Sequence, residues 1–321
     1  MAQKQTLGWL LVGLGLGLGV PSGTSGCFLV TDLDRFEVGA GEAPDDPNAP
    51  SSLTLTLRGM KAHQDHMVEF RVIDALNFVQ CRGVSAGLGP DADTGVTYRL
   101  SRAISAGNGP HRLDFYADLN HSGGYDGITL SGHDHAWRIA PLVDFPAGTP
   151  HVANLVQVDF QHNTQFIDLD EWPPGTVAPA LGPVSDAALH FEHASLAADE
   201  GHLLEVRIVQ SIAPRSTVAL YRNPAIPAVD FDASIAGTID VGVAYDVDVY
   251  LDANGNGVYD NPAAGAGDRG WRFPVTAALV GAGGAGGAGG QGGAGGGAGS
   301  VALDFTFDPA SSADDVDVGA P

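Results

Sequence analysis

Alternating oxygen-bearing side chains in the stretch "LDANGNGVYDN" have the spacing of a calcium loop. These side chains belong to Asp252, Asn254, Asn256 and Asp260. In such a loop, calcium is bound by oxygens at positions 1, 3, 5, 7 and 9, the one at position 7 being a backbone carbonyl, while glycine at position 6 allows a sharp turn. Counting from Asp252 places Gly257 at position 6 and the carbonyl of Val258 at position 7. The stretch therefore predicts a calcium site.

A second stretch, "LDFYADLNHSGGYDG", repeats the pattern earlier in the chain. Its candidate ligands are Asp118, Asn120, Ser122 and Asp126. Both stretches lack the acidic residue that usually closes the shell at position 12. Asp134 and Asp268, each eight residues beyond the last loop aspartate, are candidate substitutes if the chain folds back.

Both loops resemble the D-x-N-x-[DN]-G calcium loops of dockerins and of the B-type repeats of serine-aspartate surface adhesins. The resemblance implies calcium as cofactor. In the adhesins this loop is also carried by a β-sandwich. The alternative needs no ion, because Asp, Asn and Gly also favour Asx turns and left-handed backbone.

Histidine is the second candidate metal ligand, because imidazoles at short spacings bind zinc or copper. The candidates in the first half of the chain are His63, His66, His111, His121, His133 and His135. The second half keeps only His202 at the corresponding positions, so the scaffold does not require them. We expect scattered surface histidines, with a periplasmic transition-metal-binding protein as the alternative.

The sequence predicts no enzyme. It contains no G-x-S-x-G elbow, no H-E-x-x-H helix and no S-x-x-K pair. The glycine tract 281–299 includes G-x-G-x-x-G, but its composition excludes the helix that a dinucleotide site needs, so it is interpreted as a loop insertion. A secreted hydrolase with an unrecognised site remains the alternative.

The elements that position these residues come from an internal duplication. At an offset of 134 residues, Asp118 aligns with Asp252, Asp134 with Asp268, and Trp137 with Trp271. A period this long indicates a duplicated domain rather than a solenoid of short repeats. The repeated tryptophan is expected to anchor each core.

Each copy consists of short runs with period-two alternation, such as "SLTLTLR" and "YDVDVYLD", which predict half-buried strands. We therefore expect an all-β chain with two tandem antiparallel β-sandwich domains, Ig-like or transthyretin-like. The expected boundaries are a signal peptide 1–27, an acidic tether 28–50, copy 1 at 51–168, a proline-rich linker 169–184, copy 2 at 185–309 and an acidic tail 310–321.

The N-terminus predicts export. A lysine-bearing start, an apolar run and small residues before Cys27 form a signal-like segment, and "TSGC" resembles a bacterial lipobox with Thr24 in place of the usual leucine. Lipid on Cys27 would leave Cys81 as a free, buried thiol, whereas an unmodified Cys27 could form a disulfide with it. The expected location is the cell envelope, with a periplasmic or secreted protein as the alternative.

The charge limits the partners. The chain has 38 acidic and 15 basic residues and a formal net charge of −23. Such a chain repels nucleic acid and anionic lipid surfaces. We expect an extracellular or envelope ligand, no nucleic acid, and membrane contact only through an N-terminal lipid.

Overall fold

The computed structural model describes most of the two repeats and little outside them. The described residues are 50–105, 109–128, 133–142, 154–162, 166–169, 185–212, 215–236, 239–240, 242–257, 259–262, 267–276, 278–279, 301–308 and 318. They all belong to one unit, Glu37–Pro321. The predicted signal peptide, the glycine tract and nearly all of the tether, linker and tail lie outside the described residues.

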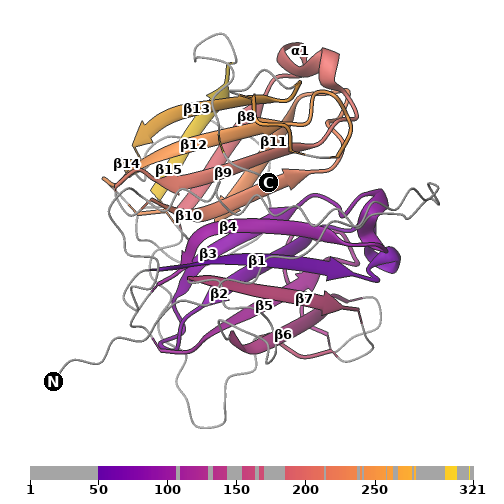
Figure 1. Cartoon of the computed structure of the whole chain (residues 1–321), viewed down its shortest axis with the longest axis vertical. Coiled ribbons are helices and arrows are strands. Elements are labelled where there is room, and N and C mark those ends of the chain that lie inside the picture. Colours follow the sequence, from indigo (N-terminus) through magenta and orange to yellow (C-terminus); the bar gives the residue numbers. More distant parts are fainter. Residues whose placement is uncertain are drawn as a thin grey trace, which may run out of the picture. The chain divides into compact units, whose positions relative to one another are not determined.

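The described part of the first repeat contains seven strands, labelled in Figure 1, and two short 3-10 helices, η2 and η3. Their bounds are β1 Ser51–Arg58, η2 Lys61–His63, β2 Val68–Ile73, β3 Val79–Ser85, η3 Pro90–Ala92, β4 Val96–Ile104, β5 His111–Ala117, β6 His135–Leu142 and β7 Leu155–Gln161. Strand β1 shows how the sequence produces this structure. Its leucines at alternate positions are buried, and its threonines between them are partly exposed.

The second repeat contains the remaining strands. Their bounds, with those of the short helices, are β8 Ser185–Phe191, α1 His193–Leu196, η4 Ala197–Asp199, β9 Leu204–Gln210, β10 Ser216–Asn223, β11 Phe231–Ala236, β12 Ala244–Leu251, β13 Arg269–Thr276, β14 Ala278–Leu279 and β15 Val301–Phe307. Strands dominate both repeats, so the all-β prediction is confirmed. No described helix has the length and apolar character that a membrane crossing requires.

The strands form three sheets, with the orders β4-β1-β7, β13-β12-β9-β10-β3-β2-β5-β6 and β11-β8-β15-β14. The prediction of purely antiparallel sheets is wrong in three places, because β1 pairs with β7, β8 with β15 and β3 with β10 in parallel. In each repeat the last strand returns beside the first and runs in the same direction. Pairing of β3 with β10 continues one sheet from the first repeat into the second.

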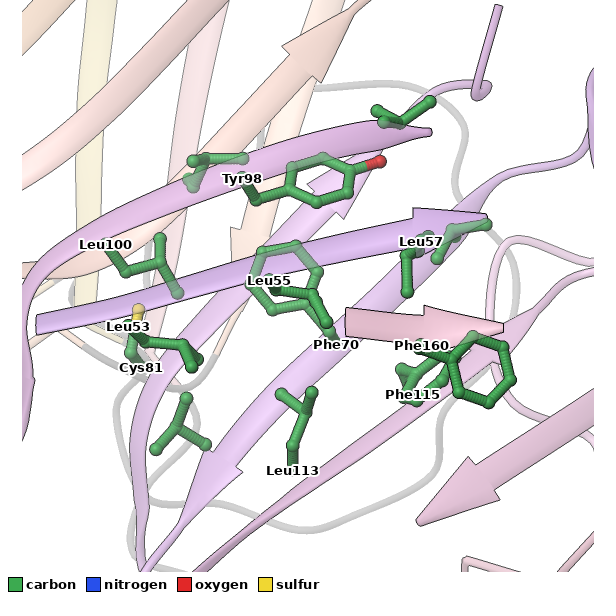
Figure 2. Close-up of a cluster of buried hydrophobic side chains, with 14 of the residues drawn as sticks. Leu53, Leu55, Leu57, Phe70, Cys81, Tyr98, Leu100, Leu113, Phe115 and Phe160 are labelled. Atoms are coloured by element: carbon green, nitrogen blue, oxygen red, sulfur yellow. The ribbon is translucent and has the colours of Figure 1, made fainter. Parts of the chain in front are cut away.

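Two hydrophobic cores lie between the sheet layers. The first is formed by β1 and β4 on one side and β2, β3 and β5 on the other, with Leu55, Phe70, Tyr98 and Phe115 among its fully buried side chains (Figure 2). Trp137 belongs to this core and Trp271 to the second, at 3% and 0% exposure. The prediction that the repeated tryptophan anchors each core is confirmed.

Cys81 lies inside the first core as a free thiol (Figure 2). It is fully buried, and this burial raises the pKa of the thiol well above its ordinary value. The thiolate is the reactive form of cysteine, so Cys81 is chemically inert in the folded protein. Cys27 lies outside the described residues.

Candidate cation-binding loops and histidine cluster

The first candidate loop follows β5 and is shaped by its own polar side chains. Asp118 accepts hydrogen bonds from the backbone N–H groups of Ser122 and Gly123 at 3.1 and 2.8 Å. Asn120 Oδ1 also accepts the N–H of Ser122, at 3.0 Å, and Asn120 Nδ2 donates to Asp126 Oδ2 at 2.7 Å. Gly123 has a φ of +82°, which glycine adopts without strain.

The second candidate loop follows β12 and repeats this geometry. Asp252 accepts the N–H groups of Asn256 and Gly257 at 3.2 and 2.9 Å. The Nδ2 atoms of Asn254 and Asn256 donate to Asp260 Oδ2 at 2.8 and 2.9 Å. Val258, the predicted carbonyl ligand, lies outside the described residues.

The distant aspartates do fold back onto their loops. Asp134 Oδ2 accepts the backbone N–H of Asp126 at 2.8 Å, and its Oδ1 accepts that of Leu119 at 3.2 Å. In the second repeat, Asp268 Oδ2 accepts the N–H of Asp260 at 2.7 Å. The fixed sequence distance therefore corresponds to the same loop-closing contact in both repeats.

These loops concentrate negative charge at buried positions. Asp118 and Asp134 are 2% and 1% exposed, and Asp252 and Asp268 are 4% and 3% exposed, whereas Asp126 and Asp260 lie nearer the surface. Burial raises the pKa of Asp134 and of Asp268, and the charges of the other two loop aspartates raise it further. Asp268 Oδ1 is buried without a hydrogen-bond partner. Each loop thus holds three carboxylates whose negative charges repel one another.

Tyrosines at equivalent positions differ between the two repeats. Tyr250 donates its hydroxyl hydrogen to Asp268 Oδ2 at 2.7 Å. Its counterpart Tyr116 donates instead to Glu69 Oε2 at 2.8 Å. The second loop is therefore tied to its strand through the closing aspartate, a contact that the sequence did not predict.

Repeated ion pairs hold the strands that carry these loops. Arg138 in β6 forms a two-pronged pair with Asp114 in β5, at 2.7 and 2.9 Å. Arg272 and Asp248 form the same pair in β13 and β12, at 2.6 and 2.8 Å. The arginine that follows the repeated tryptophan thus fixes the hairpin from which each loop emerges.

Four of the six predicted histidines of the first repeat gather in one cluster instead of scattering over the surface; they are His63, His66, His121 and His135. His63 Nε2 lies 3.4 Å from His135 Nδ1 and 3.2 Å from His162 Nε2. The ring of His66 lies 6.3 Å from that of His63 between centroids and stacks on His121 at 4.9 Å. His162, which follows β7, is a member that the sequence did not predict. His63 ends η2 and His135 begins β6.

The other two predicted histidines lie elsewhere. His133 Nδ1 approaches the backbone oxygen of Asp126 at 3.4 Å, and His111 lies at the start of β5 near Ser105. His63 is 2% exposed, and burial first, then the neighbouring His135, His162 and His66, lower its pKa to about 4. The imidazole at the centre of the cluster is therefore neutral at neutral pH.

As the side chains stand, the described part of the chain holds no set of three His, Cys, Asp or Glu residues able to hold a metal ion. Binding at either place therefore requires side chains to turn. No protein-family model, curated protein or solved structure matches the chain.

Proposed function

We propose that the chain is an exported, lipid-anchored binding or structural protein of the cell envelope. Each repeat forms a β-sandwich domain, and each domain presents a calcium-binding loop. Two hydrophobic cores and two loops of one design support the part of this proposal that concerns two domains with a loop each. Loops at the end of a rigid β scaffold are suited to recognition of a ligand.

The observation that carries the calcium proposal is the return of Asp134 and Asp268 onto their loops. A second observation is independent of the loop geometry: Asp268 Oδ1 is buried and has no hydrogen-bond partner. A buried carboxylate oxygen without a partner is costly, and a cation is the partner that would remove this cost. The second observation favours an ion over a simple turn in the second repeat.

One calcium ion would offset two of the three negative charges of each loop. In the second repeat, the amides of Asn254 and Asn256 now donate hydrogens to Asp260. Ion binding would replace these donors, so part of the binding energy would be spent on breaking their hydrogen bonds. We therefore expect weak sites, with dissociation constants of about 0.1–1 mM, in the range of extracellular calcium modules.

Calorimetric titration of the whole chain with calcium tests the proposal. We expect two binding events and a rise in melting temperature. Asp268→Asn should abolish one event and Asp134→Asn the other, because asparagine keeps a hydrogen-bond acceptor for the loop but lacks the charge. Circular dichroism without calcium verifies that each variant is folded.

Asp91→Asn is the matched control, because it removes an exposed carboxylate outside both loops and should leave both events unchanged. Absence of heat and of thermal stabilisation at about 10 mM calcium would overturn the calcium assignment. Loss of both events in the Asp91 variant would show that only net charge matters.

Lipid attachment has its own test. We expect radiolabelled palmitate to be incorporated into the chain in bacterial cells and to be lost in Cys27→Ser. Cys81→Ser should retain the label, because that thiol is buried in the core. Incorporation that survives Cys27→Ser would disprove an anchor at this residue.

A further inference from the structure

The histidine cluster brings together imidazole nitrogens from three separate segments. His63 ends η2, His135 begins β6 and His162 follows β7. The Nε2 atom of His63 lies 3.2 Å from His162 Nε2 and 3.4 Å from His135 Nδ1. These segments are far apart in the sequence, so the cluster is a product of the fold rather than of local spacing.

In the second repeat, the positions that correspond to His63 and His135 hold an ion pair. Asp199 and Arg269 align with His63 and His135, and they form an ion pair with Arg269 Nη1 3.8 Å from Asp199 Oδ2. The first repeat has two imidazoles at the same positions, and they repel each other if both are protonated. The second repeat shows that the scaffold does not require histidines at these positions.

The spacing of the nitrogens suits a transition-metal ion. Zinc binds imidazole nitrogen at about 2.0–2.1 Å in tetrahedral sites, which places two ligand nitrogens about 3.3–3.4 Å apart. The two observed separations, 3.2 and 3.4 Å, are close to this value. The rings do not yet surround a common point, so binding requires them to turn and the hydrogen between each pair of nitrogens to leave.

The orientation of the His66 ring suits a fourth ligand. Its Nδ1–H donates to the backbone oxygen of Asp118 at 3.0 Å, so Nε2 is the ring nitrogen that would bind the ion. Histidine ligands typically donate their second ring N–H to such an acceptor, which fixes the tautomer and the ring orientation. The stacked ring of His121 holds His66 in place.

Aromatic side chains enclose the cluster on its inner side. Trp137 lies 5.6 Å from the His63 ring between centroids, and Phe166 lies 4.2 Å from that of His135. An apolar shell of this kind restricts water at a metal site.

We propose that His63, His135 and His162, with His66, bind one divalent transition-metal ion of the zinc and copper class. This site uses different ligands from the proposed calcium loops, because calcium prefers oxygen ligands and imidazole favours transition metals, although His66 borders the first loop through Asp118 and His121. The two repeats therefore differ in function although they share a scaffold.

Titration of the whole chain with zinc, followed by calorimetry and thermal melting, tests the proposal. We expect one zinc ion per chain and a rise in melting temperature that millimolar calcium does not reproduce. Cobalt should replace zinc and give the intense visible absorption of a tetrahedral site. Absence of zinc-dependent stabilisation in the parent chain would overturn the proposal.

The second repeat supplies the decisive variant. The double substitution His63→Asp with His135→Arg installs the ion pair that Asp199 and Arg269 form there. The variant should fold without metal and lose the bound zinc and the cobalt spectrum. His162→Gln, at a partly exposed position, removes one ligand with less risk to the fold and should weaken binding at least tenfold.

His133→Gln is the control, because this histidine lies outside the cluster. It should bind zinc as the parent does. Undiminished zinc binding in both the double variant and His162→Gln would show that the ion binds elsewhere, and would refute the site.

Discussion

At the scale of single residues, a carboxylate buried among arginines stabilises the sheet beneath the first loop. Glu69 in β2 is 2% exposed and accepts hydrogen bonds from Arg71, Arg82 and Tyr116 at 2.6–2.8 Å. Burial alone would raise its pKa, but Arg82 and Arg71 hold the pKa below the ordinary value. We predict that Glu69→Ala lowers the free energy of unfolding by about 1–3 kcal/mol, because it removes the acceptor of the buried Tyr116 hydroxyl.

Urea denaturation of the parent and variant measures this loss. Asp159→Ala is the matched control, because Asp159 also pairs with an arginine, Arg58. The side chain of Asp159 is 67% exposed, whereas that of Glu69 is buried. Its cost should be at most about 1 kcal/mol. Similar losses in the two variants would contradict a special role for the buried network.

At the scale of elements, the start of β5 makes the first repeat sensitive to acid. His111 is 5% exposed and lies near Asp74, which caps the turn between β2 and β3 by accepting the N–H groups of Leu76 and Phe78. Burial lowers the pKa of His111 below 6.5, although the charge of Asp74 opposes this. The unfolded chain therefore takes up this proton at higher pH than the folded chain does.

It follows that the stabilisation from neutral His111 is complete above about pH 6.5 and is lost as the pH falls through that value. Urea denaturation between about pH 7 and pH 5 should show a decline in stability that is smaller in His111→Gln. The decline should persist in part, because His63 and His135 also have lowered pKa values. An equal decline in parent and variant would contradict the assignment.

Local patterns in the sequence predicted the strands and the loop-closing aspartates, because both follow from residue alternation and from a duplicated spacing. They did not predict that His162 lies beside His63. That contact depends on β1 pairing with β7 in parallel, with Arg58 opposite Gln161, so that the ends of both strands meet. Alternation identifies a strand but does not specify its partner, and long-range pairing is therefore the part that required the structure.

At the scale of the whole molecule, the shared sheet couples the two repeats. Arg82 to Ser85 of β3 pair with Ala219 to Arg222 of β10. Leu220, in the second repeat, is fully buried and belongs to the core of the first, while Val84 of the first repeat belongs to the core of the second. Each core is thus completed by a side chain from the other repeat, and we expect the repeats to unfold together.

Leu220→Ala tests this coupling. The cavity should cost about 2–5 kcal/mol, and hydrogen exchange should accelerate in β2 and β4 of the first repeat although the substitution lies in the second. Leu204→Ala, at a fully buried position in the second core, is the control and should first accelerate exchange in β9 and β12. If Leu220→Ala accelerates exchange only in strands of the second repeat, the shared sheet does not transmit stability, and the repeats behave as independent domains.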